Sequence, residues 1–147
     1  MQSLIRRYLP HIILGLSVSL VIVGAYLAVG IAQINAPKAS WAINPLTITF
    51  SGAAHSGATT DSFTCSPSTT NIFLTARSSN PSMISLTVAP TSFASCGSTP
   101  DTVTITATCL VSATQCKGTY QGLVQIHSPS NYYGNIPDNL KVIIVVT

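Results

Sequence analysis

Four cysteines are the residues whose type and spacing point most directly to chemistry: Cys65, Cys96, Cys109 and Cys116. An even number of cysteines in a small exported domain predicts two disulfides, which can pair in three ways. Cys109 and Cys116 flank a short connection between two predicted strands, so we expect a local bridge there. A bridge between Cys65 and Cys96 follows by elimination. A zinc site is disfavoured because the chain has no Cys-x-x-Cys pair.

The remaining reactive side chains do not form a catalytic or metal-binding set. The chain has no Glu, and Asp61, Asp101 and Asp138 are far apart, each at a turn or a strand start where Asp binds backbone amides. His55 lies in a Ser/Gly loop and His127 at a strand end, and we expect both to be solvated. No nucleophile elbow, phosphate loop or carboxylate cluster for calcium is present in the sequence. The sequence therefore predicts a protein that is not an enzyme and has no cofactor.

An apolar run over residues 12–32 determines the expected compartment. It contains no charged residue, and about 20 such residues span a ~30 Å hydrocarbon core as a helix. Arg6 and Arg7 precede the run, so the positive-inside rule places the rest of the chain outside the cytoplasmic membrane. Cysteines oxidise there. The residues expected to contact lipid include Ile12, Leu14, Leu20, Val23 and Ile31.

The run fits two alternatives, and the sequence leaves both open. As a cleaved signal peptide, it offers small residues in Gly30-Ile31-Ala32 before Gln33. As a retained transmembrane anchor, it is longer than a typical signal-peptide core. Residues 1–32 are thus a signal peptide or an anchor, and either alternative predicts an extracellular or cell-surface domain.

The composition indicates how the exported part stays soluble. Charged residues make up 6% of the chain, against about 25% in typical domains, whereas Ser and Thr supply 34 of the 108 residues from Ser40 onward. The absence of a basic patch argues against nucleic acid as a partner. After Ala32, four Lys and Arg residues stand against three Asp, and a net charge near zero favours self-association unless sugars cover the surface. Proline blocks the sequon at Asn80-Pro81-Ser82, so any glycan would be O-linked.

Alternating apolar residues predict an all-β domain over residues 45–147, after a linker at 33–44 that is a candidate donor strand. We expect about seven strands in an immunoglobulin-like β-sandwich preceded by one apolar helix. The last strand is apolar on both faces, through Ile143 and Val145 on one side, so it should be central and covered on both sides, or paired across an interface. The predicted strands are 46–50, 61–66, 72–77, 84–88, 103–107, 120–126 and 140–146.

The order of these segments resembles that of BACON-like immunoglobulin domains of prokaryotic surface proteins. The most specific part of the resemblance is the step Gly118-Thr119-Tyr120-Gln121-Gly122. The resemblance implies a sandwich with Tyr120 at the start of a strand, and it implies no common catalytic site. The other segments that carry it are Leu46-Thr47-Ile48-Thr49-Phe50, Ile84-Ser85-Leu86-Thr87-Val88, Val103-Thr104-Ile105-Thr106 and Leu140-Lys141-Val142-Ile143-Ile144.

The favoured function is a structural subunit of an extracellular filament or surface layer that binds copies of itself. The chain resembles subunits of archaeal threads and pili, in which an apolar segment precedes a Ser/Thr-rich β head. It departs from archaeal pilins at the processing site, where Arg7 is followed by Tyr8, so we expect strand complementation after signal cleavage. The alternatives are a membrane-anchored binding module and an accessory subunit of a membrane complex. Candidate interface residues are Trp41, Tyr132, Tyr133, Ile143 and Val145.

Overall fold

The computed structural model describes residues 36–129 and 135–147. The expected signal or anchor at residues 1–32 lies outside these residues, as do Tyr132 and Tyr133. The described residues belong to a compact unit that spans Pro37–Thr147. Among them, no helix has the length and hydropathy that a bilayer crossing requires.

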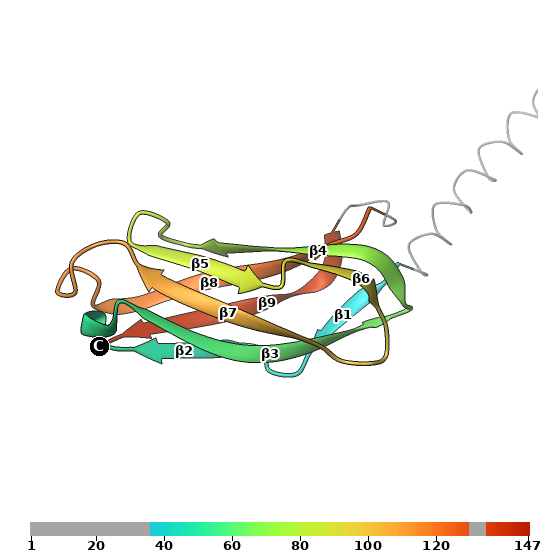
Figure 1. Cartoon of the computed structure of the whole chain (residues 1–147), viewed down its shortest axis with the longest axis horizontal. Helices are drawn as coiled ribbons and strands as arrows, with labels where there is room; N and C mark the ends of the chain where they lie inside the picture. The colour runs from blue at the N-terminus through green and yellow to red at the C-terminus, as the bar shows by residue number, and fades with distance from the viewer. Residues whose placement is uncertain (1–35, 130–134) are drawn as a thin grey trace, which may run out of the picture. The chain divides into compact units, whose positions relative to one another are not determined.

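The compact unit is an all-β sandwich of two sheets (Figure 1). One sheet has four strands in the order β1-β3-β7-β5, and the other has five in the order β2-β9-β8-β4-β6. Strand β2 runs parallel to β9, and every other pairing is antiparallel. The elements are β1 (Lys38–Trp41), β2 (Leu46–Phe50), the 3-10 turn η1 (Gly52–Ala54), β3 (Ser56–Ser66), β4 (Thr69–Ser78), β5 (Ile84–Ala89), β6 (Ser92–Cys96), β7 (Asp101–Cys109), β8 (Gly118–His127) and β9 (Asn135–Val146).

Both lateral edges of the sandwich are formed by chain that changes sheets. Strand β1 pairs with β3 in the four-stranded sheet, and after residues 42–45 the chain continues as β2 beside β9 in the other sheet. On the opposite edge, β5 pairs with β7, and after Pro90 and Thr91 the chain continues as β6 beside β4. The backbone stays paired at the second crossing, because the Leu74 amide donates to the Thr91 carbonyl at 2.8 Å. The two sheets are therefore joined by covalent chain along both sides.

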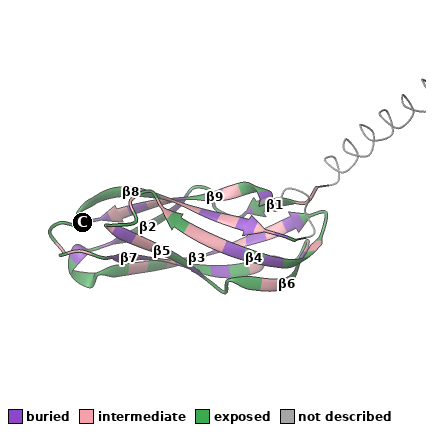
Figure 2. Ribbon diagram, turned by 90° about the horizontal axis from the view of Figure 1, so that it is seen from above, coloured by how far each residue is buried: buried purple, intermediate pink, exposed green. Residues whose placement is uncertain are grey.

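The core lies between the sheets, and alternation along the strands fills it. Buried and exposed residues alternate along most strands, as Figure 2 shows. Burying one Val, Leu, Ile or Phe side chain stabilises the fold by about 1.5–3 kcal/mol, so this apolar layer is the main favourable contribution. The largest fully buried side chains include Ile48, Phe63, Ile72, Ile84, Ile105, Ile126, Leu140 and Ile144.

The structure extends the strand pattern that the sequence predicts. The strand at 46–50 is found as β2, whereas the others are longer than expected. Strand β1 falls within the predicted linker at 33–44, and the Ala39 and Trp41 side chains alternate into the core, so the sandwich begins before residue 45. Strand β6 falls within a predicted loop. Its segment Ser-Phe-Ala-Ser-Cys carries too little apolar alternation to be recognised locally.

The last strand, β9, is interior to its sheet, as its apolar sequence predicts, but it is not covered on both sides as expected for a central strand. It lies between β2 and β8 and is hydrogen-bonded to both. Leu140, Val142 and Ile144 are buried between the sheets, whereas Ile143 and Val145 face outward and remain partly exposed. One face of this strand is thus covered by the core, and the other forms part of the molecular surface.

Tyr120 and Gly122 of the Gly-x-Tyr-x-Gly step each have a structural role. The Tyr120 hydroxyl donates to the Cys116 carbonyl at 2.9 Å, which holds the connection that leads into β8 against the start of that strand. Gly122 lies where the two sheets approach closely: a Cβ built there would be 2.5 Å from Leu86 Cδ2. Tyr120 thus anchors the β7–β8 connection, and Gly122 leaves space for a core side chain of the opposite sheet.

The substitution Gly122→Ala should therefore destabilise the sandwich. Overpacking a close-packed core costs about 1–3 kcal/mol, since Leu86 must leave its preferred rotamer. Denaturant unfolding measures the loss. The matched control is Gly97→Ala, where the new Cβ meets only the Ser68 Cβ at 3.5 Å and stability should change little. Equal losses for the two variants would contradict the close approach at Gly122.

Candidate functional site

Two disulfides tie the sandwich. Cys65 of β3 is bonded to Cys96 at the end of β6, which connects the two sheets across 31 residues of sequence. Cys109 is bonded to Cys116, which closes the connection between β7 and β8 over 7 residues. These are the two pairs that the sequence leads us to expect. No described cysteine is free.

Trp41 is a core residue, although the sequence marks it as a candidate interface residue. Its side chain is 8% exposed, and its ring lies 5.0 Å from that of Phe63, centroid to centroid. The indole Nε1 donates to the Asp138 carbonyl at 2.9 Å. Because strand β1 alternates, Ala39 and Trp41 face the core while Lys38 and Ser40 face solvent. Trp41 therefore anchors the first strand and is not available to a partner while that strand is in place.

The crossing from β1 to β2 is bound to an irregular segment of β9. Ile126 pairs with Ile136 and Val124 with Leu140, so β9 advances four residues where β8 advances two. Asn44 bridges this segment: its Nδ2 donates to the Asn139 carbonyl, and its Oδ1 accepts from the Lys141 amide, both at 3.1 Å. These bonds satisfy backbone groups of β9 just before the β2–β9 pairing, which begins at Leu46 and Val142.

Asp61 supports the same crossing from the core side. It lies in the middle of β3 and is 5% exposed. Its Oδ1 accepts hydrogen bonds from the Ser62 amide at 2.8 Å and the Ile43 amide at 3.2 Å, whereas its Oδ2 has no hydrogen-bond partner among the described residues. Burial raises the pKa of this carboxyl, and the two backbone hydrogen bonds oppose the shift. The side chain thus holds the turn after β1.

The described histidines and carboxylates do not gather into a reactive cluster. Within residues 36–129 and 135–147, no group of three His, Cys, Asp or Glu side chains could hold a metal ion. His55 is exposed beside η1, as expected. His127 is only half-exposed: its ring stacks on that of Phe73 at 4.9 Å, and its Nε2 lies 2.8 Å from the Thr75 hydroxyl. The most distinctive features of the described residues lie on the outer faces of the two sheets.

The outer face of the four-stranded sheet carries mainly hydroxyl groups. Strand β7 alone places four threonines on it, because every second residue of that strand is Thr. In the sheet register, Thr104 lies beside Thr60 and Thr106 beside Thr87. This hydroxyl face comprises Ser40, Thr60, Ser62, Thr64, Ser85, Thr87, Thr102, Thr104, Thr106 and Thr108.

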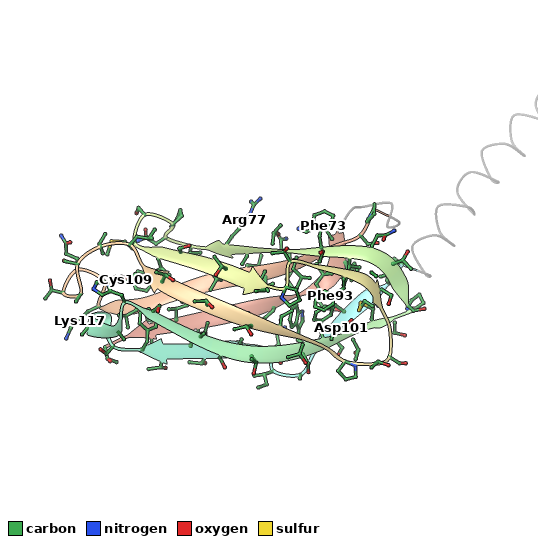
Figure 3. All side chains as sticks on the ribbon, in the orientation of Figure 1. Phe73, Arg77, Phe93, Asp101, Cys109 and Lys117 are labelled. Atoms are coloured by element: carbon green, nitrogen blue, oxygen red, sulfur yellow. A yellow bond between two sulfur atoms is a disulfide. The ribbon has the colours of Figure 1, made fainter. Side chains whose placement is uncertain are left out.

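The outer face of the five-stranded sheet has a different chemistry, and we call it the apolar face. Phe73 is 46% exposed there, and Leu123, Ile143 and Val145 are partly exposed. In the sheet register, Leu123 of β8 lies between Arg77 of β4 and Lys141 of β9. Figure 3 shows Phe73 and Arg77 projecting from the same side of the molecule.

A groove crosses the apolar face along that row. Its floor and walls are mainly apolar, and the exposed cations Arg77 and Lys141 rim it. Ile143, an interface candidate from the sequence, lines the groove, and Val145 lies next to it on the same face of β9. Sequence reasoning missed Phe73, Arg77 and Leu123, although an apolar residue among the outward positions of β4 and β8 was a usable signal. The full lining is Pro45, Arg77, Ser78, Ser79, Gln121, Gly122, Leu123, Lys141, Val142 and Ile143.

Comparison with known proteins gives remote structural likenesses. No protein-family model matches the chain, and no curated protein sequence matches it. Similar solved structures include a PapD-like domain of human CEP192 (14% identity, TM-score 0.46, covering 77% of this chain and 87% of that one). Another is a Bacteroides ovatus GH5 xyloglucanase (14% identity, TM-score 0.45, covering 75% of this chain and 19% of that one). A third comprises domains 4 and 5 of the S-layer protein SbsC (10% identity, TM-score 0.44, covering 75% of this chain and 51% of that one).

The chain thus spans about half of the S-layer fragment and about a fifth of the xyloglucanase. Identities and TM-scores this low support no statement about function.

Loss of the two disulfides should affect stability unequally. Cross-linking restricts the unfolded chain more when the closed loop is longer. The double variant Cys65→Ala/Cys96→Ala should therefore lose about 4 kcal/mol, and Cys109→Ala/Cys116→Ala about 2 kcal/mol. Denaturant unfolding of both variants gives the comparison. A reversed order would show that the shorter loop contributes more than its length explains.

Asp61 should make stability depend on pH in a defined direction. A carboxyl whose pKa is higher in the folded than in the unfolded state binds more protons when folded, so stability falls as pH rises above the unfolded pKa of about 3.9. Asp61→Asn keeps an acceptor for both amides and does not titrate. Urea unfolding from acid to neutral pH should therefore show the wild type losing stability relative to Asp61→Asn. A pH-independent difference would contradict the raised pKa.

Proposed function

We propose that this protein is a structural subunit of an extracellular or cell-surface assembly, and that it joins copies of itself by strand complementation. The observation that carries the proposal is strand β1, a four-residue edge strand whose side chains complete the core. In this proposal the protein serves as building material and catalyses no reaction.

The chemistry of the sandwich supports an extracellular setting. Its two disulfides are stable in an oxidising compartment, and the apolar run at residues 12–32 supplies a route of export. The hydroxyl face keeps the surface polar without charge, and in this proposal it also carries any O-linked glycans. A near-neutral surface of this kind imposes little electrostatic repulsion between copies.

The topology favours β1 as the strand that is exchanged in this proposal. Strand β9 already closes the five-stranded sheet from within the chain, so the fold needs no foreign C-terminal strand. Strand β1 pairs with β3 alone, through four residue pairs, and residues 42–45 connect it to the rest of the sandwich. A β1 from a neighbouring copy would form the same ladder, the same Trp41–Phe63 contact and the same bond to Asp138. The candidate donor segment 33–44 thereby narrows to Lys38–Trp41.

Engineered cysteines can show which chain supplies β1. Ser40 and Thr64 are register partners on the outer face of β1 and β3, on the side away from the native Cys65 disulfide. The variant Ser40→Cys/Thr64→Cys, treated in the assembled state with a short thiol-reactive cross-linker, should give a ladder of covalent multimers on denaturing gels. A product that runs as monomer would show that β1 stays in its own chain and would overturn the proposal.

The matched control places the same chemistry between β3 and β7. Thr60 and Thr104 are also register partners on the outer face. Both strands belong to one sandwich whether or not β1 is exchanged, so Thr60→Cys/Thr104→Cys should cross-link within a single chain. Multimers from this control would indicate random collision between copies. The multimer ladder from the first variant would then no longer be evidence that β1 comes from another chain.

A further inference from the structure

The groove on the apolar face has the composition of a site for an anionic partner. Arg77 and Lys141 lie on either side of Leu123 in one row across three strands, and no residue that lines the groove is acidic. A guanidinium binds a carboxylate through two parallel hydrogen bonds, and an ammonium adds a second charge contact. The groove therefore fits a surface that presents a carboxylate beside apolar groups.

Another copy of this chain presents accessible carboxylates. Of the described carboxylates, Asp61 is buried, whereas Asp138 is exposed and Asp101 is partly exposed. Asp101 and Asp138 lie at one end of the sandwich, where the exposed Lys38 lines the same hollow as Asp138, so two carboxylates face one ammonium there. Asp101 pairs with Phe63, Phe63 pairs with Trp41, and Trp41 donates to the Asp138 carbonyl. We call this the acidic end.

One chain cannot bring its own groove and Asp101 together. Arg77 projects outward from β4 in the five-stranded sheet, whereas Asp101 begins β7 in the four-stranded sheet, and Figure 3 shows them on opposite sides of the molecule. The two charges can therefore meet only between copies. Contact between two different surfaces of the same subunit leaves one of each free at the ends, so the chain of contacts stays open unless it closes into a ring.

We propose that the groove between Arg77 and Lys141 receives the acidic end of a second copy, with Asp101 as the partner of Arg77. This contact shares with the proposed function the premise that copies associate, but it uses a surface separate from strand β1. The apolar residues Leu123 and Ile143 supply the buried part of the contact, and the charges set its orientation.

Charge reversal tests the contact directly. The groove variant is Arg77→Glu/Lys141→Glu, and the end variant is Asp101→Arg. Like charges brought together at an interface oppose association strongly, so each variant alone should associate roughly tenfold or more weakly than the wild type in analytical ultracentrifugation. An equimolar mixture of the two variants should recover association, because each reversed surface then meets its complement. The control Lys117→Glu changes an exposed cation outside the groove and should associate as the wild type does.

Unchanged melting temperatures would show that the variants are folded. Wild-type association by either variant alone, or loss of association without recovery in the mixture, would overturn the docking proposal. The result is distinguishable from that of the β1 cross-link. A multimer ladder with no effect of charge reversal would retain strand exchange and remove the groove contact, whereas the opposite pair of results would retain the groove contact alone.

Discussion

The sandwich depends on a constraint at its edges: the chain must change sheets without leaving backbone groups unpaired. Such groups are costly when buried, so each crossing needs substitute partners. At residues 42–45, the Asp61 carboxylate, the Asn44 amide and the Trp41 indole supply hydrogen bonds that a regular ladder would have made. A buried carboxylate with a raised pKa is tolerated in the core because it supports this turn.

This arrangement separates the residues that hold the fold from those that form the outer surface. Trp41 and Asp61 are polar or amphipathic, yet both are structural. Stability is distributed between an apolar layer and two disulfides, and the surface is left with few charges. On a surface with few charged side chains, each one has more influence on how two copies would be oriented, since few other charged side chains compete with it. Arg77, Lys141 and Asp101 gain importance in this way.

The two outer faces give the molecule a direction. The hydroxyl face carries mainly Ser and Thr side chains, and the apolar face carries partly exposed apolar side chains, two cations and an exposed phenylalanine. In the proposed assembly, the unlike faces and the exchange of edge strand β1 would together allow subunits to extend into a polymer. Strand exchange and groove contact would act at different places, so a polymer could use one for continuity and the other for orientation.

The sequence by itself determined the class of fold, the approximate positions of every strand except β1 and β6, and the expected disulfide pairs. These follow from short-range patterns: alternation with a period of two, and two cysteines that flank a short connection. It could not identify β1 or β6, because a short edge strand is selected by the neighbour it pairs with rather than by its own residues. It also could not show that Trp41 is buried or that Asp61 supports a turn far from it in sequence. Only the tertiary structure brings Arg77, Leu123 and Lys141 into one row, because that row depends on the register of three strands, which no local pattern specifies.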